Sequence, residues 1–291
     1  MKEIVILSGK GGTGKTSLTA SFASLANKAV LADCDVDAAD LHLILKPDIQ
    51  TTHTFTSGHE AVIRTQDCSL CDICTDYCRF GAIQRNEESG EYNIDSIACE
   101  GCGVCVRFCP DHCIDFPMRE CGEWYHSNTR FGPMVHAHLG IAAENSGKLV
   151  SLVREEAKKK ARQVQADVLL VDGPPGIGCP VIASITGADF LVLVTEPTLS
   201  GKHDIERVLQ LTKHFNLPVS VVVNKWDINP AMTAEIEDLA STYSAHLLGR
   251  IRYDKAITQA QIEEKSVIEL GESEVSKDIQ IIWNQVQAIA C

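Results

Sequence analysis

The feature that most constrains this chain is an internal repeat made of two cysteine runs. Both runs have the spacing C-x2-C-x2-C-x3-C, and an isoleucine follows each of them at the same distance. The matching residues are Cys68, Cys71, Cys74, Cys78 and Ile83 in the first run, and Cys99, Cys102, Cys105, Cys109 and Ile114 in the second. Because every one of them recurs at one constant offset, the sequence predicts two copies of one small structural unit.

The spacing within the runs predicts two [4Fe–4S] clusters. It is the pattern of two-cluster bacterial ferredoxins, which also place a proline where Pro110 follows the second run. In that pattern three thiolates of a run hold one cluster and the fourth reaches the other cluster. A pair of structural zinc sites, which use thiolates in C-x2-C pairs, is the alternative. The expected ligand sets are Cys68, Cys71, Cys74 and Cys109 for one cluster, and Cys99, Cys102, Cys105 and Cys78 for the other.

The two copies of the repeat are not identical. Arg79 stands where the second copy has Pro110, and Cys113 stands where the first copy has Ala82. Neither difference removes a ligand. They predict two clusters that differ in solvent exposure and in reduction potential.

A second motif lies near the N-terminus. The stretch GKGGTGKT matches G-x-x-x-x-G-K-[ST], and it follows an expected strand over residues 3–8 and opens a helix, which is the context of a phosphate-binding P-loop. Its backbone N–H groups surround the phosphates, Lys15 reaches the β and γ phosphates, and the Thr16 hydroxyl ligates Mg²⁺. The nucleotide-binding residues expected here are Gly11, Gly12, Thr13, Gly14, Lys15, Thr16 and Ser17.

The same loop contains a second lysine, Lys10. With this lysine, GKGGTGKT resembles the deviant Walker A motif of the MinD, ParA, Mrp and nitrogenase iron-protein group. The whole chain resembles MinD-superfamily P-loop ATPases that contain an inserted ferredoxin domain. The resemblance implies ATP and Mg²⁺ as ligands, ATP hydrolysis, and a homodimer in which Lys10 reaches the nucleotide of the facing subunit. The alternative for Lys10 is a solvated loop charge.

Two acidic strand ends agree with the resemblance. In LVDGPPG, the resemblance implies that Asp172 holds Mg²⁺ through its water shell and that the Gly176 amide senses the γ phosphate. In DCDVD, Asp35 occupies the position of a switch aspartate that orients or deprotonates the attacking water. Asp33 and Asp37 either share this work or cap the following turn. The catalytic residues expected from these motifs are Lys10, Lys15, Asp35 and Asp172.

The nucleotide base has a candidate partner in Asn224, which ends an aliphatic strand in the stretch NKWD. This stretch looks like the base-binding motif of P-loop proteins, with Asn224 hydrogen-bonded to the purine. Asp227 also makes it similar to Asn-Lys-x-Asp, the guanine reader of small GTPases. The resemblance to the MinD group favours ATP over GTP.

Nearly continuous Val and Leu runs alternate with helical stretches along the rest of the chain. This alternation predicts an α/β fold with a doubly wound, mostly parallel sheet. Residues 1–60 and 120–291 are expected to form the P-loop ATPase domain, and residues 61–119 an inserted small α+β domain of the ferredoxin type. A C-terminal helix is expected to pack one apolar face against the core. That face comprises Ile279, Ile282, Trp283, Val286 and Ile289.

The composition restricts the partners and the compartment. The formal net charge of -13 disfavours a nucleic-acid partner, because such binding needs clustered Lys and Arg. No apolar run is long enough to cross a bilayer, and the C-terminal helix has only Lys277 as a basic residue, so no membrane partner is expected. Thirteen cysteines without a signal-peptide pattern predict a cytoplasmic protein with metal-bound thiols. The expected partner is a redox or iron–sulfur acceptor protein.

A few cysteines and histidines lie outside these motifs. In the nitrogenase iron protein, a cysteine at the spacing of Cys179 from Asp172 ligates a cluster shared between subunits. Cys179 is therefore a candidate for a bridging cluster, with Cys121 as a possible partner, although a small buried thiol behind the turn is the favoured interpretation. The other leftover groups are two cysteines expected to be structural and two histidines that either flank a site or, as is more common, are satisfied surface or core groups. They are Cys34, Cys291, His136 and His138.

Two functions fit these motifs. The first is an ATP-gated electron carrier, in which nucleotide binding closes the dimer and hydrolysis resets it. The second is an iron–sulfur assembly or carrier ATPase, in which the nucleotide controls delivery of a labile cluster. Eight dedicated thiolates favour the first function because they hold clusters permanently. Spatial organisation on DNA or membrane, as in ParA and MinD, is disfavoured by the acidic charge.

Overall fold

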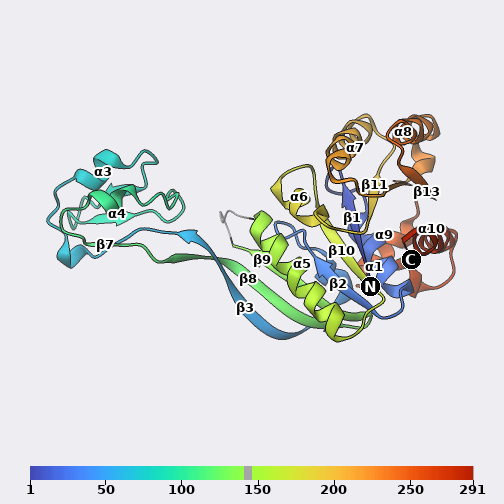
Figure 1. Cartoon of the computed structure of the whole chain (residues 1–291), viewed down its shortest axis with the longest axis horizontal. Helices are drawn as coiled ribbons and strands as arrows, with labels where there is room; N and C mark the ends of the chain where they lie inside the picture. Colours follow the sequence, from blue (N-terminus) through green and yellow to red (C-terminus); the bar gives the residue numbers. More distant parts are fainter. Residues whose placement is uncertain (141–145, 291) are drawn as a thin grey trace. The chain divides into compact units, whose positions relative to one another are not determined.

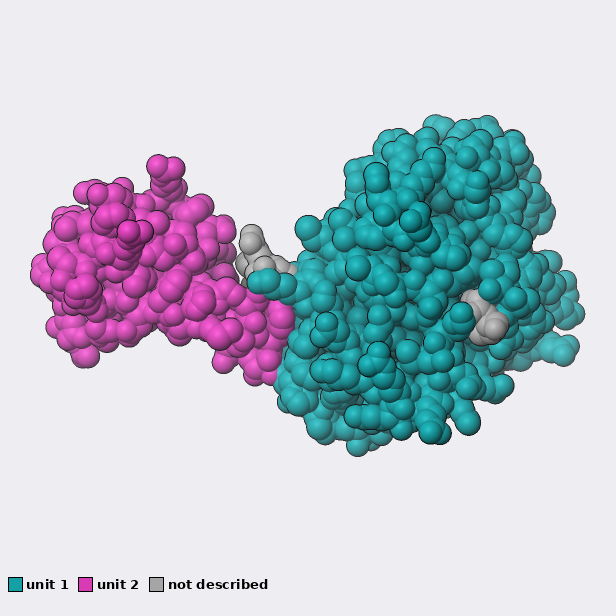
Figure 2. Space-filling model, viewed as in Figure 1, with its two compact units in different colours: residues 1–53, 123–139, 145–291 teal, residues 54–122, 140–144 magenta. Residues whose placement is uncertain are grey.

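The computed structural model describes residues 1–140 and 146–290, and these form two compact units (Figures 1 and 2). The first unit comprises residues 1–53, 123–139 and the described residues from 146 onward, and the second comprises residues 54–122 and Gly140. Strands β3 (Asp48–His59) and β8 (Met118–Thr129) each contribute to both units. The second unit is therefore longer than the insert expected over residues 61–119.

The first unit is built on a nine-stranded sheet with the order β13-β12-β11-β1-β10-β2-β9-β8-β3 (Figure 1). Every pairing from β13 to β9 is parallel, which confirms the predicted mostly parallel α/β sheet. Only Arg130 and Phe131 separate β8 from β9, so these two strands form a hairpin, since parallel neighbours need a long crossover. The other strands of the sheet are β1 (Lys2–Ser8), β2 (Ala29–Asp33), β9 (Gly132–Leu139), β10 (Val168–Pro175), β11 (Phe190–Thr195), β12 (Val219–Asn224) and β13 (His246–Ile251).

Both faces of this sheet are buried. Ile4 and Ile6 of β1 belong to a core cluster with Phe22 and Trp283, while Val5 points to the opposite face and is equally buried. A strand buried on both faces needs no polar alternation, which is why β1 reads as an apolar run. Helix α1 contacts α2 and α10, α5 contacts α6, and α7 contacts α8. The helices of this unit are α1 (Lys15–Leu25), α2 (Leu41–Leu45), α5 (Ser146–Gln163), α6 (Cys179–Ile185), α7 (Leu199–Thr212), α8 (Pro230–Thr242), α9 (Lys255–Ile262) and α10 (Glu274–Ala290).

The C-terminal helix α10 packs as predicted over most of its length. Ile279, Ile282, Trp283 and Val286 are buried, and the Trp283 ring lies 5.0 Å from the ring of Phe22. Ile289 was expected to pack with this face, and that expectation is wrong, because 45% of its surface is exposed. The last turn of α10 extends beyond the core that holds the earlier turns. No helix in the described part of the chain is long and apolar enough to span a bilayer.

The second unit repeats its backbone at the offset of the cysteine runs. Helix α3 (Ile73–Tyr77) corresponds to α4 (Val104–Phe108), and β5 (Ile83–Arg85) begins at the residue that corresponds to the start of β7 (Ile114–Asp115). Positive φ angles also recur in pairs, at Leu70 and Gly101, Asp72 and Gly103, and Gly81 and His112. Two equivalent segments therefore adopt one conformation although their side chains differ.

Two small sheets complete the second unit. Strand β4 (Val62–Ile63) pairs antiparallel with β7, and β5 pairs antiparallel with β6 (Tyr92–Ile94). The unit has its own small core, in which Ile83, Tyr92 and Ile114 pack with cysteine side chains from both runs. So few apolar residues bury little surface, so this core by itself contributes only modestly to the stability of the unit.

Candidate functional site

The loop between β1 and α1 has a shape that only glycine permits at two positions. A Cβ atom on Gly9 would lie 2.5 Å from the Cβ of Asp204, and one on Gly14 would lie 2.4 Å from Nδ2 of Asn224. Gly14 also has a φ of 90°, which disfavours other residues. Neighbouring segments therefore hold the loop closely. This leaves Lys15 as the first residue of α1, at the positively polarised end of the helix.

Lys15 is buried among carboxylates. Its Nζ lies 2.9 Å from Oδ1 of Asp172 and 3.4 Å from Oδ2 of Asp35. Asp172 lies within β10 and pairs with Asp33, the last residue of β2, so the parallel pairing of these strands brings Asp172 close to Asp35, which follows β2. The structure thus collects three of the predicted catalytic residues at one place.

Burial and charge together set the titration of this group. Burial disfavours the charge on Lys15, but the carboxylates of Asp172, Asp35 and Asp33 outweigh it and raise the pKa of Lys15. The pKa of Asp35 is raised to about 6, mainly by burial, although Lys15 opposes the rise. A carboxylate with a pKa near 6 accepts a proton more readily than an ordinary aspartate, which suits the expected role of Asp35 toward an attacking water.

Asp172 is also held by two hydroxyl groups. Thr16 donates to its Oδ2 at 2.8 Å, and Thr19 donates to its Oδ1 at 2.9 Å. Thr16 is the predicted Mg²⁺ ligand and lies at the mouth of the site. Thr19 was missed from the sequence, although its position one helical turn after Lys15 on α1 was a signal that it faces the same side.

The acidic residues beside Asp35 have different roles. Asp33 is fully buried and accepts hydrogen bonds from the backbone N–H groups of Asp35 and Leu41, so it caps the turn after β2. Burial and the nearby Asp172 raise its pKa well above the usual range. Asp37 is exposed. Of the two interpretations offered for Asp33, the capping one matches the structure.

An open cavity lies over the loop. It has an empty volume of about 1100 Å³. The Thr13 hydroxyl oxygen of the loop is buried without a hydrogen-bond partner among the described residues. An orphaned hydroxyl and a glycine-rich cradle beside a lysine fit a bound polyphosphate with its cation. The cavity is lined by the predicted nucleotide-binding residues Gly11, Gly12, Thr13, Gly14, Lys15, Thr16 and Ser17, together with Asp35, Pro175 and Gln261, among others.

The second unit contains two cavities of nearly equal size, each lined by four of the predicted cysteine ligands. The first has an empty volume of about 310 Å³ and the second about 300 Å³. In each cavity three cysteines come from one run and the fourth comes from the other run. The first is lined by Cys68, Cys71, Cys74 and Cys109, and the second by Cys78, Cys99, Cys102 and Cys105.

These cysteines differ in exposure between the two cavities. Cys71 and Cys102 are exposed, whereas Cys74 and Cys109 of the first cavity are buried and their counterparts Cys105 and Cys78 are half-buried. All cysteines in the described residues are free thiols. In the described part of the chain, no group of three or more His, Cys, Asp or Glu side chains is placed so that it could hold a single metal ion.

A family model described as the CobQ/CobB/MinD/ParA nucleotide binding domain matches residues 4–267. The chain belongs to this family. P-loop ATPases of the MinD/ParA group hydrolyse ATP, and the chain is a nucleotide-binding P-loop ATPase of this kind. The resemblance to MinD/ParA P-loop ATPases and the ATP hydrolysis that it implied are therefore confirmed.

Relatives support the same assignment. An uncharacterised protein of Methanocaldococcus jannaschii is 34% identical over 231 residues, which is 78% of this chain and 79% of that protein. Among solved structures, septum site-determining protein MinD of Pyrococcus horikoshii, complexed with Mg-ADP, has a TM-score of 0.58 at 19% identity and covers 99% of this chain and 97% of its own. The MinC:MinD cell division complex of Aquifex aeolicus gives a TM-score of 0.60 at 19% identity, covering 99% of this chain and 96% of that chain. These two likenesses establish a MinD-like fold.

In this MinD/ParA-family chain, the second lysine of the loop contacts the start of α7. Lys10 Nζ lies 3.0 Å from the Ser200 hydroxyl and 3.9 Å from Oε2 of Glu196. Lys225 Nζ lies 2.5 Å from the other oxygen of the same carboxylate. Lys10 is about one-third exposed, so it remains near the surface with weak local partners. Its expected reach to a second subunit stays a prediction.

The switch segment after Asp172 continues as part of the sheet. Strand β10 extends to Pro175, which pairs with Ser8, and the Gly176 amide donates to the Ser8 carbonyl at 3.0 Å. In this arrangement the amide that was expected to sense the γ phosphate is already hydrogen-bonded. Its sensing role stays a prediction and requires that this bond open.

Asn224 braces the loop. Its Nδ2 donates to the Thr13 carbonyl at 2.8 Å, and its Oδ1 accepts from the Lys225 amide at 3.0 Å. Asn224 does line an apolar cavity of about 400 Å³ beside the loop, but both amide atoms already have backbone partners. Gln261, which sequence reasoning missed, lines both this cavity and the larger one and donates to Ser17. Gln261 is far from the loop in the sequence and belongs to no motif, so nothing in the sequence indicated that it lies beside the loop.

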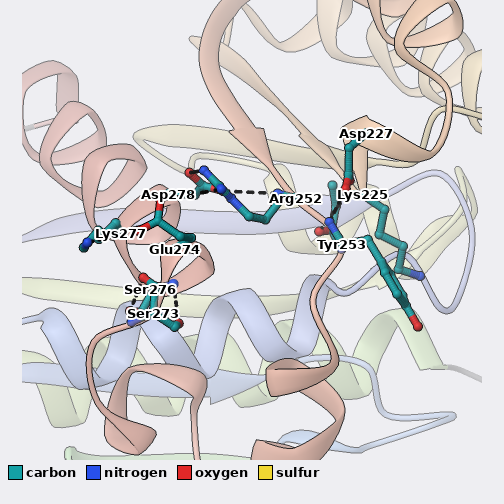
Figure 3. A network of polar contacts seen from close by, with 10 residues as sticks. Lys225, Asp227, Arg252, Tyr253, Ser273, Glu274, Ser276, Lys277 and Asp278 are labelled. Carbon is teal, nitrogen blue, oxygen red and sulfur yellow. Dashed lines mark hydrogen bonds and ion pairs between the residues drawn. The ribbon is translucent and has the colours of Figure 1, made fainter.

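Asp227 does not line either cavity. Figure 3 shows it beside Tyr253, whose amide donates to its Oδ1 at 2.7 Å. In the same network the guanidinium group and the backbone amide of Arg252 donate three hydrogen bonds to Asp278 of α10. Asp227 therefore anchors the segment after β13. This structural role accounts for an aspartate at the last position of the NKWD stretch.

The remaining sequence candidates divide between the two units. Cys179 begins α6 and is exposed, so the favoured interpretation of a small buried thiol is wrong. A position at the start of the helix, past the turn of Gly178, leaves its side chain open to solvent. Cys121 is buried and donates to the Ser57 carbonyl. The others are Cys34, which is buried, Cys291, which lies outside the described residues, His136, which bonds Ser127, and the exposed His138.

Proposed function

We propose that this chain is an ATP-driven switch protein that carries two [4Fe–4S] clusters and couples its nucleotide state to electron transfer with a protein partner. The observation that carries the proposal is the pair of cavities in the second unit. Each is lined by four of the predicted ligands as free thiols, with the fourth supplied by the other half of the repeat. The same chain belongs to an ATPase family. Together these features favour a ferredoxin-like domain inserted into a MinD-like ATPase.

The donor set of each cavity fits a cubane cluster. Cysteine thiolates are the ligands of [4Fe–4S] clusters, and the crossing of Cys109 and Cys78 between runs matches the two-cluster arrangement. Each bound cluster would supply a one-electron couple. The chain supplies the apolar surroundings through Ile83, Tyr92 and Ile114, which limit solvent access and thereby tune the potential.

The nucleotide site has the parts of a switch. Binding of a triphosphate would draw Lys15 from Asp172 toward the phosphates, which frees that carboxylate to hold hydrated Mg²⁺ together with Thr16. Asp35, with its raised pKa, is placed to accept a proton from the attacking water. Opening of the bond between Gly176 and Ser8 would then couple the γ phosphate to α6.

The assembly that we propose is a cytoplasmic homodimer with a redox or iron–sulfur acceptor protein as partner. Lys10 supports the dimer, because its local contacts are weak and surface-exposed enough to be exchanged for a phosphate of a facing subunit. MinD of Aquifex aeolicus has a solved structure in complex with MinC, so a fold of this type accommodates a protein partner.

The decisive experiment is iron and sulfide analysis of protein prepared without oxygen, followed by EPR. We expect about eight irons per chain from two cubane clusters. Electron transfer to an acceptor should depend on ATP in the wild type and be lost in Lys15→Ala, while iron content is retained. Protein that contains zinc in place of iron would refute the proposal. The exposed Cys179 offers a control, since Cys179→Ser should keep all eight irons.

The exposure of Cys179 also favours a second candidate, an iron–sulfur assembly or carrier ATPase. An exposed thiol directly after the switch segment is accessible to a labile cluster bound between subunits. In that case purified protein should transfer iron and sulfide to an apo-protein in an ATP-dependent manner. Loss of this transfer in Cys179→Ser, with electron transfer unaffected, would favour assembly over electron carriage.

A further inference from the structure

A ninth cysteine lies against the ligands of the first cysteine-lined cavity. Cys113 is 1% exposed, and its Sγ lies 3.5 Å from the Sγ of Cys109. It lines the same cavity as the four thiols Cys68, Cys71, Cys74 and Cys109. Its own carbonyl accepts a hydrogen bond from the Arg64 amide at 2.8 Å, so the backbone that carries the thiol is held in place.

The repeat supplies a natural comparison for this thiol. Ala82 occupies the matching position, is also 1% exposed, and lines the second cavity. The residue before each is in the left-handed region, Gly81 in the first copy and His112 in the second, so both side chains leave the backbone from the same local conformation. One cavity therefore has a thiol where the other has a methyl group. A thiol can donate a hydrogen bond and a methyl group cannot.

We propose that Cys113 is a positioning residue whose S–H group donates a hydrogen bond to the thiolate sulfur of Cys109 and thereby raises the reduction potential of the cluster held in the first cavity. This inference rests on the proposed function, because it requires that the cavity holds an iron–sulfur cluster. Reduction adds negative charge to the cluster and its sulfur ligands. A donor aimed at a ligand sulfur stabilises that charge, and hydrogen bonds to the sulfurs are among the features that set cluster potentials.

Cys113 is not needed as a ligand. The crossed sets already give each cavity four thiols, and the matching Ala82 shows that a complete set of four lines the second cavity without a ninth sulfur. Cys113 is buried against the proposed ligand Cys109 but is not itself needed as a ligand. What its thiol can still contribute is a hydrogen-bond donor.

Burial acts on the potential in the opposite direction. Cys74 and Cys109 of the first cavity are buried, whereas the matching Cys105 and Cys78 are half-buried. A less solvated cluster is harder to reduce, because the added charge loses hydration. The difference between the potentials of the two clusters therefore does not report the effect of the thiol alone. The test must compare the potential of each cluster in the wild type with the potential of the same cluster in a variant.

The experiment uses full-length protein prepared without oxygen and titrates it with dithionite while the cluster signals are followed by EPR. Three variants are compared with the wild type, namely Cys113→Ala, Cys113→Ser and Ala82→Cys. Iron and sulfide content is measured on each sample. In Cys113→Ala, the equilibrium constant of one of the two reduction steps should fall by about tenfold. For a one-electron step this lowers the reduction potential by about 59 mV.

The other two variants check the mechanism. Cys113→Ser keeps an O–H donor at the site and should restore most of the shift. Ala82→Cys adds a donor to the second cavity, so it should raise the other reduction step and leave the first unchanged. This variant also assigns each step to a cavity, and it tests the inference independently if Cys113→Ala assembles poorly.

The outcomes separate this inference from the proposed function. Eight irons per chain with unmoved potentials in Cys113→Ala and Ala82→Cys would overturn the role of Cys113 and leave the clusters in place. Loss of four irons in Cys113→Ala would make Cys113 a ligand and would also overturn its role as a donor. Wild-type protein without iron would refute the proposed function itself.

Discussion

At the scale of single residues, the nucleotide site depends on how Asp172 is held. Its carboxylate contacts the Lys15 ammonium group and the hydroxyls of Thr16 and Thr19 at 2.8 to 2.9 Å. The loop motif predicted Lys15 and Thr16, because their spacing is the pattern itself, and the family resemblance implied Asp172. Thr19 belongs to no motif, and only the packing of α1 on β10 shows that its hydroxyl reaches the same carboxylate.

Thr16 and Thr19 form a matched pair for a binding experiment. Thr16→Ala should lower Mg²⁺-dependent ATP affinity by about tenfold to a hundredfold, because it removes a proposed metal ligand. Thr19→Ala removes a hydrogen bond to a charged group, so it should reduce unfolding free energy by about 1–2 kcal/mol while Mg²⁺ dependence is retained. Calorimetric ATP titration with and without Mg²⁺, together with urea unfolding, measures both effects. Unchanged Mg²⁺ dependence in Thr16→Ala would contradict the assignment.

His136 gives the first unit a pH-dependent stability. Burial, with a smaller effect of His42, lowers the pKa of His136 to about 4, and its Nε2 lies 2.8 Å from the Ser127 hydroxyl. The folded state therefore disfavours protonation. The stability from the neutral ring is fully present above about pH 6.5, the pKa of an unfolded histidine, and is lost as the pH falls toward 4.

The corresponding variant is His136→Gln. Between pH 6.5 and pH 4 its unfolding free energy should fall less than that of the wild type, by up to about 3 kcal/mol, because the burial of a titrating ring is removed. Urea unfolding at a series of pH values measures the difference. The exposed His138 is the control, since His138→Gln should leave the curve unchanged. A wild-type slope retained in His136→Gln would exclude this residue as the cause.

At the scale of elements, the ends of the parallel strands assemble the site. Strands β1, β10 and β2 are neighbours in the sheet, so Ser8, Asp172 and Asp33 lie at one edge although they are far apart in the chain. The alternation of apolar runs and helices predicted these elements and their parallel pairing. It did not predict that β10 continues to Pro175 or that the Gly176 amide donates to the Ser8 carbonyl, because both depend on pairing with β1.

The packing of α10 on α1 can be tested with two positions on one helix. Trp283 is 2% exposed and contacts Phe22, whereas Ile281 is 56% exposed. Trp283→Ala should lower the unfolding free energy by about 3–5 kcal/mol, because it removes a large buried ring and leaves a cavity. Ile281→Ala should stay within about 0.5 kcal/mol of the wild type. Equal urea midpoints for the two variants would show that α10 does not depend on this core.

At the scale of the whole molecule, the proposed switch requires a second subunit. Lys10 contacts Glu196 and Ser200 at the start of α7, and Lys225 contacts the same Glu196 carboxylate. Both lysines are about one-third exposed. Only Lys10 belongs to the loop motif. Comparing variants of the two lysines therefore distinguishes a role in the facing subunit from a role in local contacts.

Lys10→Ala should abolish ATP-induced dimerisation and change ATP affinity of the monomer by only about twofold, since exposed ion pairs contribute little. Lys225→Ala should leave dimerisation intact. Light scattering after gel filtration, with ATP and Mg²⁺ present, measures the mass. A dimer that persists in Lys10→Ala would refute the cross-subunit role of this lysine.

The sequence by itself determined the features that depend on local spacing. The loop over residues 9–16 and the two cysteine runs were recognised from short patterns, because a P-loop takes its phosphate contacts from consecutive residues and each run has the spacing of three neighbouring ligands. The repeat offset also predicted the paired backbone of α3 and α4. These features follow from chemistry that operates over fewer than about twenty residues, so neighbours in the chain are sufficient to specify them.

Only the tertiary structure decided which distant groups meet. Asn224 bonds the loop backbone, Asp227 bonds the Tyr253 amide, and Cys179 is exposed, although each residue matched a pattern or an expectation of another kind. Contact between Cys109 and Cys113 required the fold of one small unit around its own core. A side chain takes its role from the partners that remain near it after packing, and those partners come from strands and helices that the local sequence does not position.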